Sequence, residues 1–205
     1  MDHKPSRLTQ WLVWGSLTAV VLAIAAVFFT RHGLGGKALP VLKEVSDFEL
    51  TNQFGRPAGL ESFRGKVWLA DIIFTRCAGP CARMTKLMSD LQTALPKVQM
   101  VSLTADPEFD NPQTLKFYGD RFGVDHDRWT FLTGPKQEIY NLATSGLLLA
   151  AMDNGESSAS LDERFIHSTL FVLVDKRGRV RSAYETDQPG IYEKILADAQ
   201  RLLRE

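Results

Sequence analysis

A buried strand followed by a cysteine-bearing turn and a helix constrains the fold of this chain more than any other feature. Residues 67–74 read VWLADIIF, a near-continuous apolar run that is typical of a centrally buried strand. Apolar residues then recur at helical spacing after Cys81, at Met84, Leu87, Met88, Leu91 and Leu95. Residues 98–103, VQMVSL, indicate a second buried strand. The sequence therefore predicts a β-α-β unit with both cysteines at its first strand-to-helix turn.

The rest of the globular part continues this alternation of helices and strands. Proline in the first turn predicts helices over 110–122 and 135–145. A turn between two apolar runs predicts a hairpin over 169–184. An amphipathic pattern predicts a last helix over 191–205. We expect one α/β domain over 41–205, with a mixed, mostly parallel sheet flanked by helices.

Residues 11–29 carry no charged side chain and, as a helix, would be long enough to cross the roughly 30 Å hydrocarbon core of a bilayer. A cleaved signal peptide is the alternative, but a small-x-small cleavage site is lacking after the run. The sequence predicts a short tail over 1–10, a transmembrane anchor over 11–29 and a glycine-containing linker over 30–40. Basic residues flank both sides of the run, so counting them leaves the orientation open.

The charge balance excludes some classes of partner. The chain has 24 basic and 24 acidic side chains, and no long block of lysine or arginine. Such a chain has no basic surface that would attract nucleic acid, so its function is to be sought in a defined site.

Cys77 and Cys81 are the only cysteines, and they lie four residues apart at the start of the predicted helix. At that spacing their Cβ atoms would lie about 5 to 6 Å apart on one face, close enough for one ion to contact both sulfurs. The helix N-terminus and Arg76 would stabilise thiolates there. The pair is thus a thiol–disulfide couple, a soft-metal site or two inert core residues.

A metal site would need a further ligand, for which four histidines are available. His3 precedes the uncharged run, His32 lies in the linker, and His126 lies in a polar stretch that indicates a solvated loop. His167 directly precedes the predicted hairpin, whose first strand can enter beside the cysteine turn. Two thiolates and one imidazole suit copper as Cu(I) or Cu(II), whereas a purely structural imidazole is the alternative.

Several segments resemble the Sco/SenC family of copper chaperones for cytochrome c oxidase assembly. They are FTRCAGPC, ADPEFDNPQTLKFYGDRFG, RWTFLTG and HSTLFVLVD, and the resemblance covers about residues 45–185. It implies a thioredoxin-like domain on one N-terminal membrane helix. Residues 1–10 are too short for a transit peptide, which favours a bacterial inner membrane over an organelle. An exported oxidase subunit as client would place the domain in the periplasm. The resemblance also implies one copper ion per domain, bound by Cys77, Cys81 and His167, with the two cysteines as redox-active thiols.

The resemblance implies that a copper-containing subunit of the oxidase receives copper from the chain or has its thiols reduced by it. Asn111 and Ala82 depart from the family's usual Thr and Pro, which leaves the client open. We interpret Asp106 and Asp110 first as turn and cap residues. Such a chaperone need not be an enzyme, although the same cysteines could exchange disulfides.

The alternatives are a general thiol–disulfide oxidoreductase, a peroxidase, or a redox- or copper-sensing domain on the same fold. Three residues separate the cysteines here, where thioredoxin-type enzymes have two, and no proline lies between Pro135 and Pro189. His167 occupies the place where such enzymes would have a cis-proline. A sensing domain would share the metal site and differ only in its partner.

Overall fold

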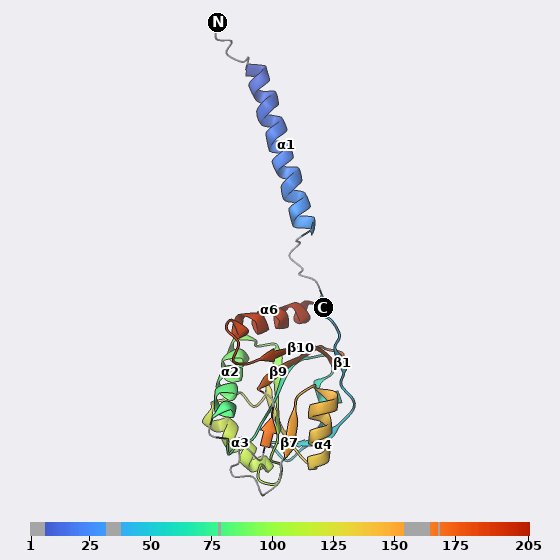
Figure 1. Ribbon diagram of the computed structural model, residues 1–205, viewed down its shortest axis with the longest axis vertical. Helices are drawn as coiled ribbons and strands as arrows, with labels where there is room; N and C mark the ends of the chain where they lie inside the picture. Colours follow the sequence, from blue (N-terminus) through green and yellow to red (C-terminus); the bar gives the residue numbers. More distant parts are fainter. Residues whose placement is uncertain (1–6, 32–37, 78, 154–164, 168) are drawn as a thin grey trace. The chain divides into compact units, whose positions relative to one another are not determined.

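The structure is a computed structural model (Figure 1) that describes residues 7–31, 38–77, 79–153, 165–167 and 169–205. Within these ranges, the side chains of residues 8, 9, 25–31, 152, 153 and 165–167 are outside the description. The chain divides into two compact units, Met1–Ala38 and Leu39–Glu205.

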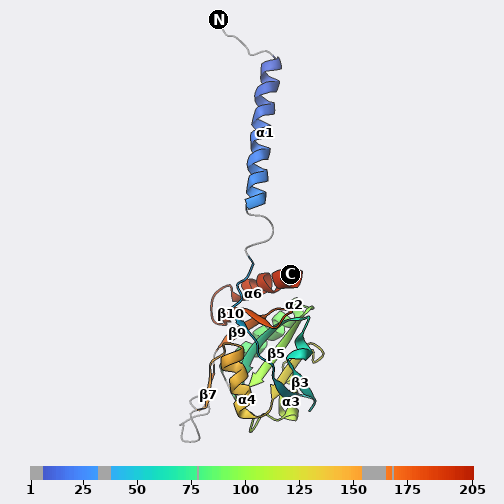
Figure 2. The same cartoon turned by 90° about the vertical axis from the view of Figure 1, so that its right-hand side faces the viewer.

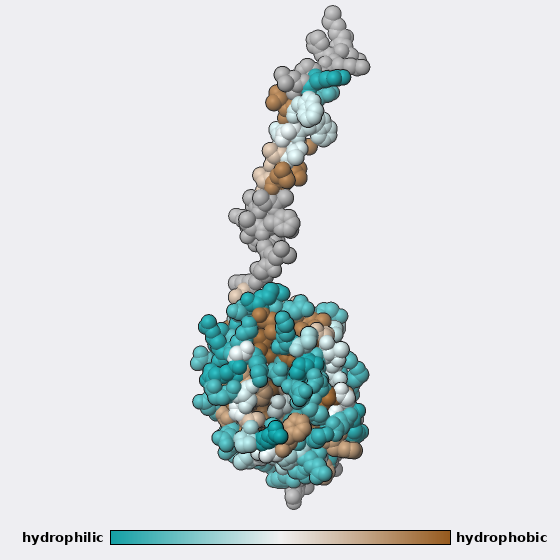
Figure 3. All heavy atoms as spheres, turned by 180° about the vertical axis from the view of Figure 1, so that it is seen from behind, coloured by the Kyte–Doolittle hydropathy of each residue, from teal (hydrophilic) through white to brown (hydrophobic). Residues whose placement is uncertain are grey.

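The described residues of the first unit include the helix α1 (Arg7–Arg31). Its described side chains are exposed (Figure 3). They include Trp11, Leu12 and Trp14. Among the described residues, no helix combines the length and the apolar character needed to cross a membrane. The transmembrane span predicted over 11–29 is therefore not found in the described part of the chain, although these residues are helical.

The second unit is built on an eight-stranded sheet (Figures 1 and 2). Its strand order is β1-β10-β9-β4-β5-β6-β2-β3. The strands are β1 (Lys43–Glu44), β2 (Glu49–Asn52), β3 (Pro57–Gly59), β4 (Val67–Ile73), β5 (Val98–Thr104), β6 (Trp129–Thr133), β9 (Leu170–Val174) and β10 (Arg179–Glu185). All seven residues of β4 are buried, which agrees with the near-continuous apolar run from which this central strand was predicted.

The sheet is mixed, but the expectation that it is mostly parallel is wrong. Only the pairs β4–β5 and β5–β6 are parallel, and the other five neighbouring pairs are antiparallel. Parallel neighbours need a crossover, which α2 (Pro80–Ala94) and α3 (Pro112–Arg121) provide. Tight turns join β2 to β3 and β9 to β10. Gly55 and Gly178 in these turns have φ of 73° and 76°, a backbone conformation that favours glycine. Short hairpins therefore extend the parallel centre on both sides.

Helices cover both faces of the sheet (Figure 1). On one face lie α2 (Pro80–Ala94), α3 (Pro112–Arg121) and α6 (Ile191–Arg204), and α2 contacts both α6 and β5. On the other face, α4 (Lys136–Asn141) continues into a π-helical turn, η2 (Leu142–Gly146), and a 3-10 turn, η1 (Leu60–Phe63), follows β3. The expected arrangement of helices flanking the sheet is confirmed.

A separate two-stranded sheet was not expected from the sequence. It pairs β7 (Ala151–Asp153) with β8 (Phe165–His167), and Ala151 lies opposite His167. His167 thus belongs to a strand, where the sequence indicated only a segment that enters the following hairpin.

Candidate functional site

The two cysteines lie where β4 gives way to α2. The chain turns sharply after Phe74, and the Cys77 amide donates to the Phe74 carbonyl at 3.2 Å. Gly79 is the N-cap of α2 and Pro80 begins the helix, where the missing amide proton costs no hydrogen bond. Cys81 is therefore in the first helical turn, as the sequence predicted.

Cys77 and Cys81 are both buried thiols and are not joined in a disulfide. A hydrogen bond with Cys77, followed by burial, raises the pKa of Cys81 well above that of an ordinary thiol. The expectation that both thiolates would be stabilised is thus wrong for Cys81. Its side chain is wholly inaccessible to solvent, and desolvation disfavours the charged form.

The positive charge of Arg76, the residue directly before Cys77, is paired with a carboxylate. Its guanidinium forms an ion pair with the carboxylate of Asp106 and lies 4.2 Å from the centre of the Phe109 ring. The Arg76 side chain is 34% exposed and that of Asp106 only 3%. Asp106 therefore compensates much of the positive charge that we expected to act on Cys77 and Cys81.

The carboxylate of Asp110 is buried beneath the same turn and binds the residues that lead into it. It accepts hydrogen bonds from the Thr75 amide at 3.1 Å, from the Thr75 hydroxyl and from the Thr104 hydroxyl. Burial raises the pKa of Asp110, and the hydrogen bonds from both threonines oppose that shift.

The interpretation of Asp110 as a helix cap is wrong. Asn111 caps α3, since its side-chain oxygen accepts from the Thr114 amide at 2.9 Å. The sequence did hold a signal for the true location. Parallel neighbouring strands end at the same edge of a sheet, so the segment that follows β5 must lie near the turn that follows β4.

His167 lies on β8, and its side chain is outside the description. The backbone gives its approximate place. The antiparallel pairing of β9 with β4, with Val172 opposite Ala70, brings the start of β9 beside the end of β4. Thr169, two residues after His167, also lines a pocket of about 370 Å³ together with Pro80. The segment just after His167 therefore lies at the cysteine turn.

His126 is not in a freely solvated loop, contrary to the sequence-based interpretation. Its Nδ1 lies 3.1 Å from the Gln53 side-chain nitrogen and its Nε2 lies 2.9 Å from an oxygen of Asp120. His3 and His32 lie outside the described residues. Within the described part of the chain, no three His, Cys, Asp or Glu side chains are grouped so as to hold a metal ion.

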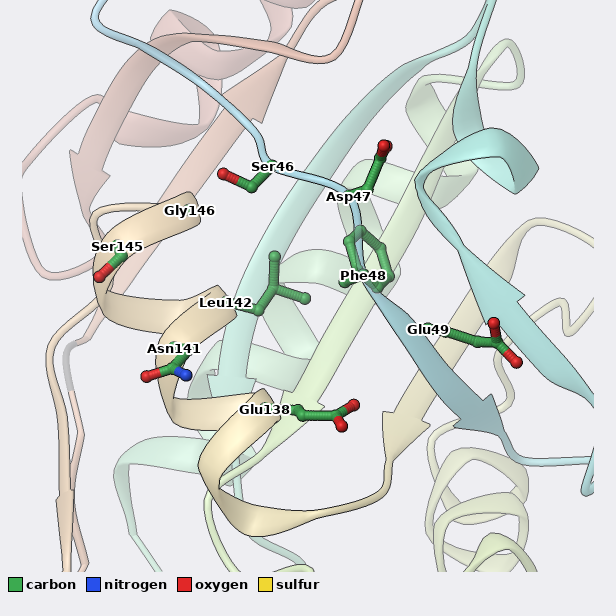
Figure 4. Close-up of a pocket in the computed structure, with 9 residues that line it drawn as sticks. All are labelled: Ser46, Asp47, Phe48, Glu49, Glu138, Asn141, Leu142, Ser145 and Gly146. Carbon is green, nitrogen blue, oxygen red and sulfur yellow. The ribbon is translucent and has the colours of Figure 1, made fainter.

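A larger pocket, of about 570 Å³, lies between the segment before β2 and the helical turns of α4 and η2 (Figure 4). Phe48 and Leu142 give it an apolar wall, and Asp47, Glu49 and Glu138 give it acidic edges. None of the predicted site residues lines it.

A mixed sheet with helices on both faces, and a pair of thiols where a central strand meets a helix, define a thioredoxin-like protein with a dithiol site. The family model described as SCO1/SenC matches residues 37–204, and the chain belongs to this family.

The SCO1 protein homolog of Bacillus subtilis (strain 168) is 34% identical to this chain over 187 residues, which cover 87% of this chain and 94% of that protein. Two solved structures are also similar. BsSco, described as a cytochrome c oxidase assembly protein with a disulfide switch, has a TM-score of 0.66 and 34% identity, with 80% and 96% of the two chains covered. Bradyrhizobium japonicum ScoI with copper bound has a TM-score of 0.65 and 25% identity, with 78% and 99% covered.

Proposed function

We propose that this chain binds one copper ion through Cys77, Cys81 and His167, and that it delivers the copper to a respiratory cytochrome c oxidase or reduces the thiols of the oxidase's copper site. The observation that carries the proposal is the pair of buried, reduced thiols in contact at the start of α2. Family membership supports the same role, since one relative was solved with copper bound and another is described as an oxidase assembly protein.

The ligand set fits copper better than zinc. Two thiolates satisfy Cu(I), and an added imidazole nitrogen extends the set to Cu(II), whereas structural zinc takes four protein ligands. The start of β9 beside the end of β4 supports His167 as the third ligand. Three protein ligands would leave room for a thiolate of the client, so that copper could pass between proteins without being released into solution.

The same cysteines support disulfide reduction when no metal is bound. One thiolate attacks a disulfide of the client, and the second displaces the client from the mixed disulfide. The client gains two thiols, and Cys77 and Cys81 become a disulfide. The hydrogen bond between the two thiols supports this second candidate, since it holds the resolving sulfur close to the attacking one.

We propose further that the domain works outside the cytoplasm, held at a bacterial inner membrane by its N-terminal segment. The support is the lack of any charged side chain over 11–29, together with the proposed client, which would belong to a respiratory membrane complex.

Copper loading of the purified protein tests the main proposal. We expect one copper ion per chain after dialysis, and almost none for Cys77→Ser or Cys81→Ser, because serine replaces a soft thiolate with a hard hydroxyl. Met84→Leu is the matched control, since Met84 is a buried sulfur-containing residue of the same helix and leucine has a similar volume. Near-stoichiometric copper in both serine variants would show that these cysteines are structural.

A further inference from the structure

The loop between β5 and α3 contacts the chain just before the cysteines at two consecutive residues. The Asp110 carboxylate binds Thr75, and the Asp106 carboxylate binds Arg76. Thr75 and Arg76 are the last two residues before Cys77. Both aspartates are buried, with 0% of the whole residue exposed for Asp110 and 2% for Asp106.

The loop that carries these carboxylates is itself firmly held. The amides of Phe109 and Asp110 donate to the Asp106 carbonyl at 3.2 and 2.9 Å, and the Asp106 amide donates to the Thr104 hydroxyl at 3.0 Å. The Tyr140 hydroxyl, from the opposite face of the sheet, donates to the Ala105 carbonyl at 2.8 Å. A carboxylate on such a loop can fix a neighbouring segment, because it cannot easily move with that segment.

We propose that Asp110 is the positioning residue of the cysteine pair: by binding both the amide and the hydroxyl of Thr75, it fixes where the chain leaves β4 and so holds Cys77 against Cys81. Asp110 has no role as a ligand or proton carrier in this proposal. Its effect is on the effective concentration of one sulfur at the other, which governs both disulfide formation and two-thiolate copper binding. The effect on copper binding rests on the proposed copper function, and the effect on disulfide formation does not.

The test measures the equilibrium between the dithiol and the disulfide in the full-length protein. Cys77 and Cys81 are equilibrated with glutathione, so that one oxidised glutathione is consumed and two reduced glutathiones are released for each disulfide formed. For Asp110→Ala we expect the disulfide to be disfavoured by roughly tenfold, which is at the lower end of the usual effect of residues that orient a site. A tenfold change corresponds to a rise of about 30 mV in the reduction potential of the Cys77–Cys81 pair. Thr75→Val removes only one of the hydrogen bonds and should give a smaller shift in the same direction.

Asn111→Ala is the matched control. It removes the cap of α3 at the next residue, so it should lower the unfolding midpoint of the protein, but Asn111 makes no described contact with Thr75. We expect its disulfide equilibrium to stay within about threefold of the original. Equal equilibria for Asp110→Ala and Asn111→Ala would overturn the proposal.

If Asp110→Ala does not fold, Asp110→Asn takes its place. The asparagine keeps one acceptor oxygen, and an equilibrium unchanged in both Asp110→Asn and Thr75→Val would also overturn it.

Copper binding by the same variants separates this proposal from the proposed function. If the original protein binds no copper but the disulfide equilibrium shifts as expected, Asp110 positions a redox pair and the copper function is wrong. If copper binds and the Asp110 variants leave both the disulfide equilibrium and the copper affinity unchanged, the positioning role is wrong and the copper function stands.

Discussion

Arg76 and Asp106 form an ion pair directly before the cysteine turn, and the Arg76 guanidinium also packs on the ring of Phe109. A positive charge directly before Cys77 would ordinarily stabilise the thiolate form of the nearby cysteines. Because the carboxylate of Asp106 lies against it, the thiols experience a pair of opposite charges. The reactivity of the site is thus set partly by Asp106, a residue 30 positions further along the chain.

Substitutions that neutralise each partner in turn should affect thiol reactivity differently. Arg76→Met removes the positive charge and leaves the buried carboxylate of Asp106 uncompensated, so we expect the alkylation rate of the more reactive thiol at pH 7 to fall. Asp106→Asn leaves the positive charge of Arg76 uncompensated and should raise that rate. The rates can be measured with iodoacetamide in the metal-free, reduced protein. A large fall in Arg76→Met together with no change in Asp106→Asn would mean that Arg76 acts on the thiols directly.

The centre of the fold could be predicted from sequence because its strands are buried on both faces. The apolar runs at 67–74 and 98–103 correspond to β4 and β5, and their crossover helix begins at Pro80. The direction of the outer strands was harder to predict. β2 and β3 are four and three residues long, with few buried side chains, so their hairpin gives little periodic signal.

The position of Cys77 and Cys81 followed from local pattern, since both lie within a few residues of a strong strand signal. The roles of Asp106 and Asp110 did not, because they depend on contacts across neighbouring strands. Asp110 stands two residues before Pro112, at the start of a helix, and a carboxylate at such a place indicates a cap on local grounds. The pairing of β4 with β5 brings Asp110 to Thr75, and a contact of this kind between distant segments leaves no local pattern in the sequence.

Asp175 should make the stability of the domain depend on pH. Burial alone would raise its pKa, but hydrogen bonds from Arg179 and Arg181 outweigh burial, so the pKa is lowered. Arg181 in turn donates to the carbonyls of Leu39 and Pro40, which ties the start of the domain to β10. For a depressed pKa, the stabilisation is present above the unfolded-state value of about 3.9 and is lost as pH falls through the folded-state value.

We therefore expect Asp175→Asn to lower the free energy of unfolding by about 1 to 2 kcal/mol at pH 7, after allowance for solvent screening. The difference in unfolding free energy from the original protein should be constant between about pH 5 and 7, where Asp175 is ionised in both the folded and the unfolded state. It should shrink below about pH 4, as the unfolded-state carboxyl becomes protonated. Urea unfolding at several pH values measures it. Asp187→Asn, at an exposed carboxylate, is the control. A difference that persists undiminished at pH 3 would show that Asp175 acts through packing rather than through its charge.

The proposed location gives a simple expectation for a fusion protein. A reporter that is active only outside the cytoplasm, joined after Glu205, should be active, and the fusion should sediment with the inner membrane. Deletion of residues 1–38, the first compact unit, should abolish export of the reporter and its membrane association. Activity of a cytoplasm-only reporter at the same junction would contradict the location and, with it, an oxidase client outside the cytoplasm.

His167→Ala should separate copper chaperoning from thiol–disulfide exchange. The imidazole would complete a three-ligand site, so its loss should weaken Cu(II), which favours nitrogen ligands, more than Cu(I), which two thiolates can hold. Disulfide reduction by Cys77 and Cys81 should persist, because thiol–disulfide exchange requires the two sulfurs and no imidazole. His126→Gln is the matched control: it removes a histidine that contacts Gln53 and Asp120 and should leave copper binding intact.

In cells, the chaperone function requires that His167→Ala lower oxidase activity and that added copper restore part of it. If His167→Ala keeps full oxidase activity while Cys77→Ser loses it, the chain serves the oxidase as a thiol reductase, and copper binding is secondary.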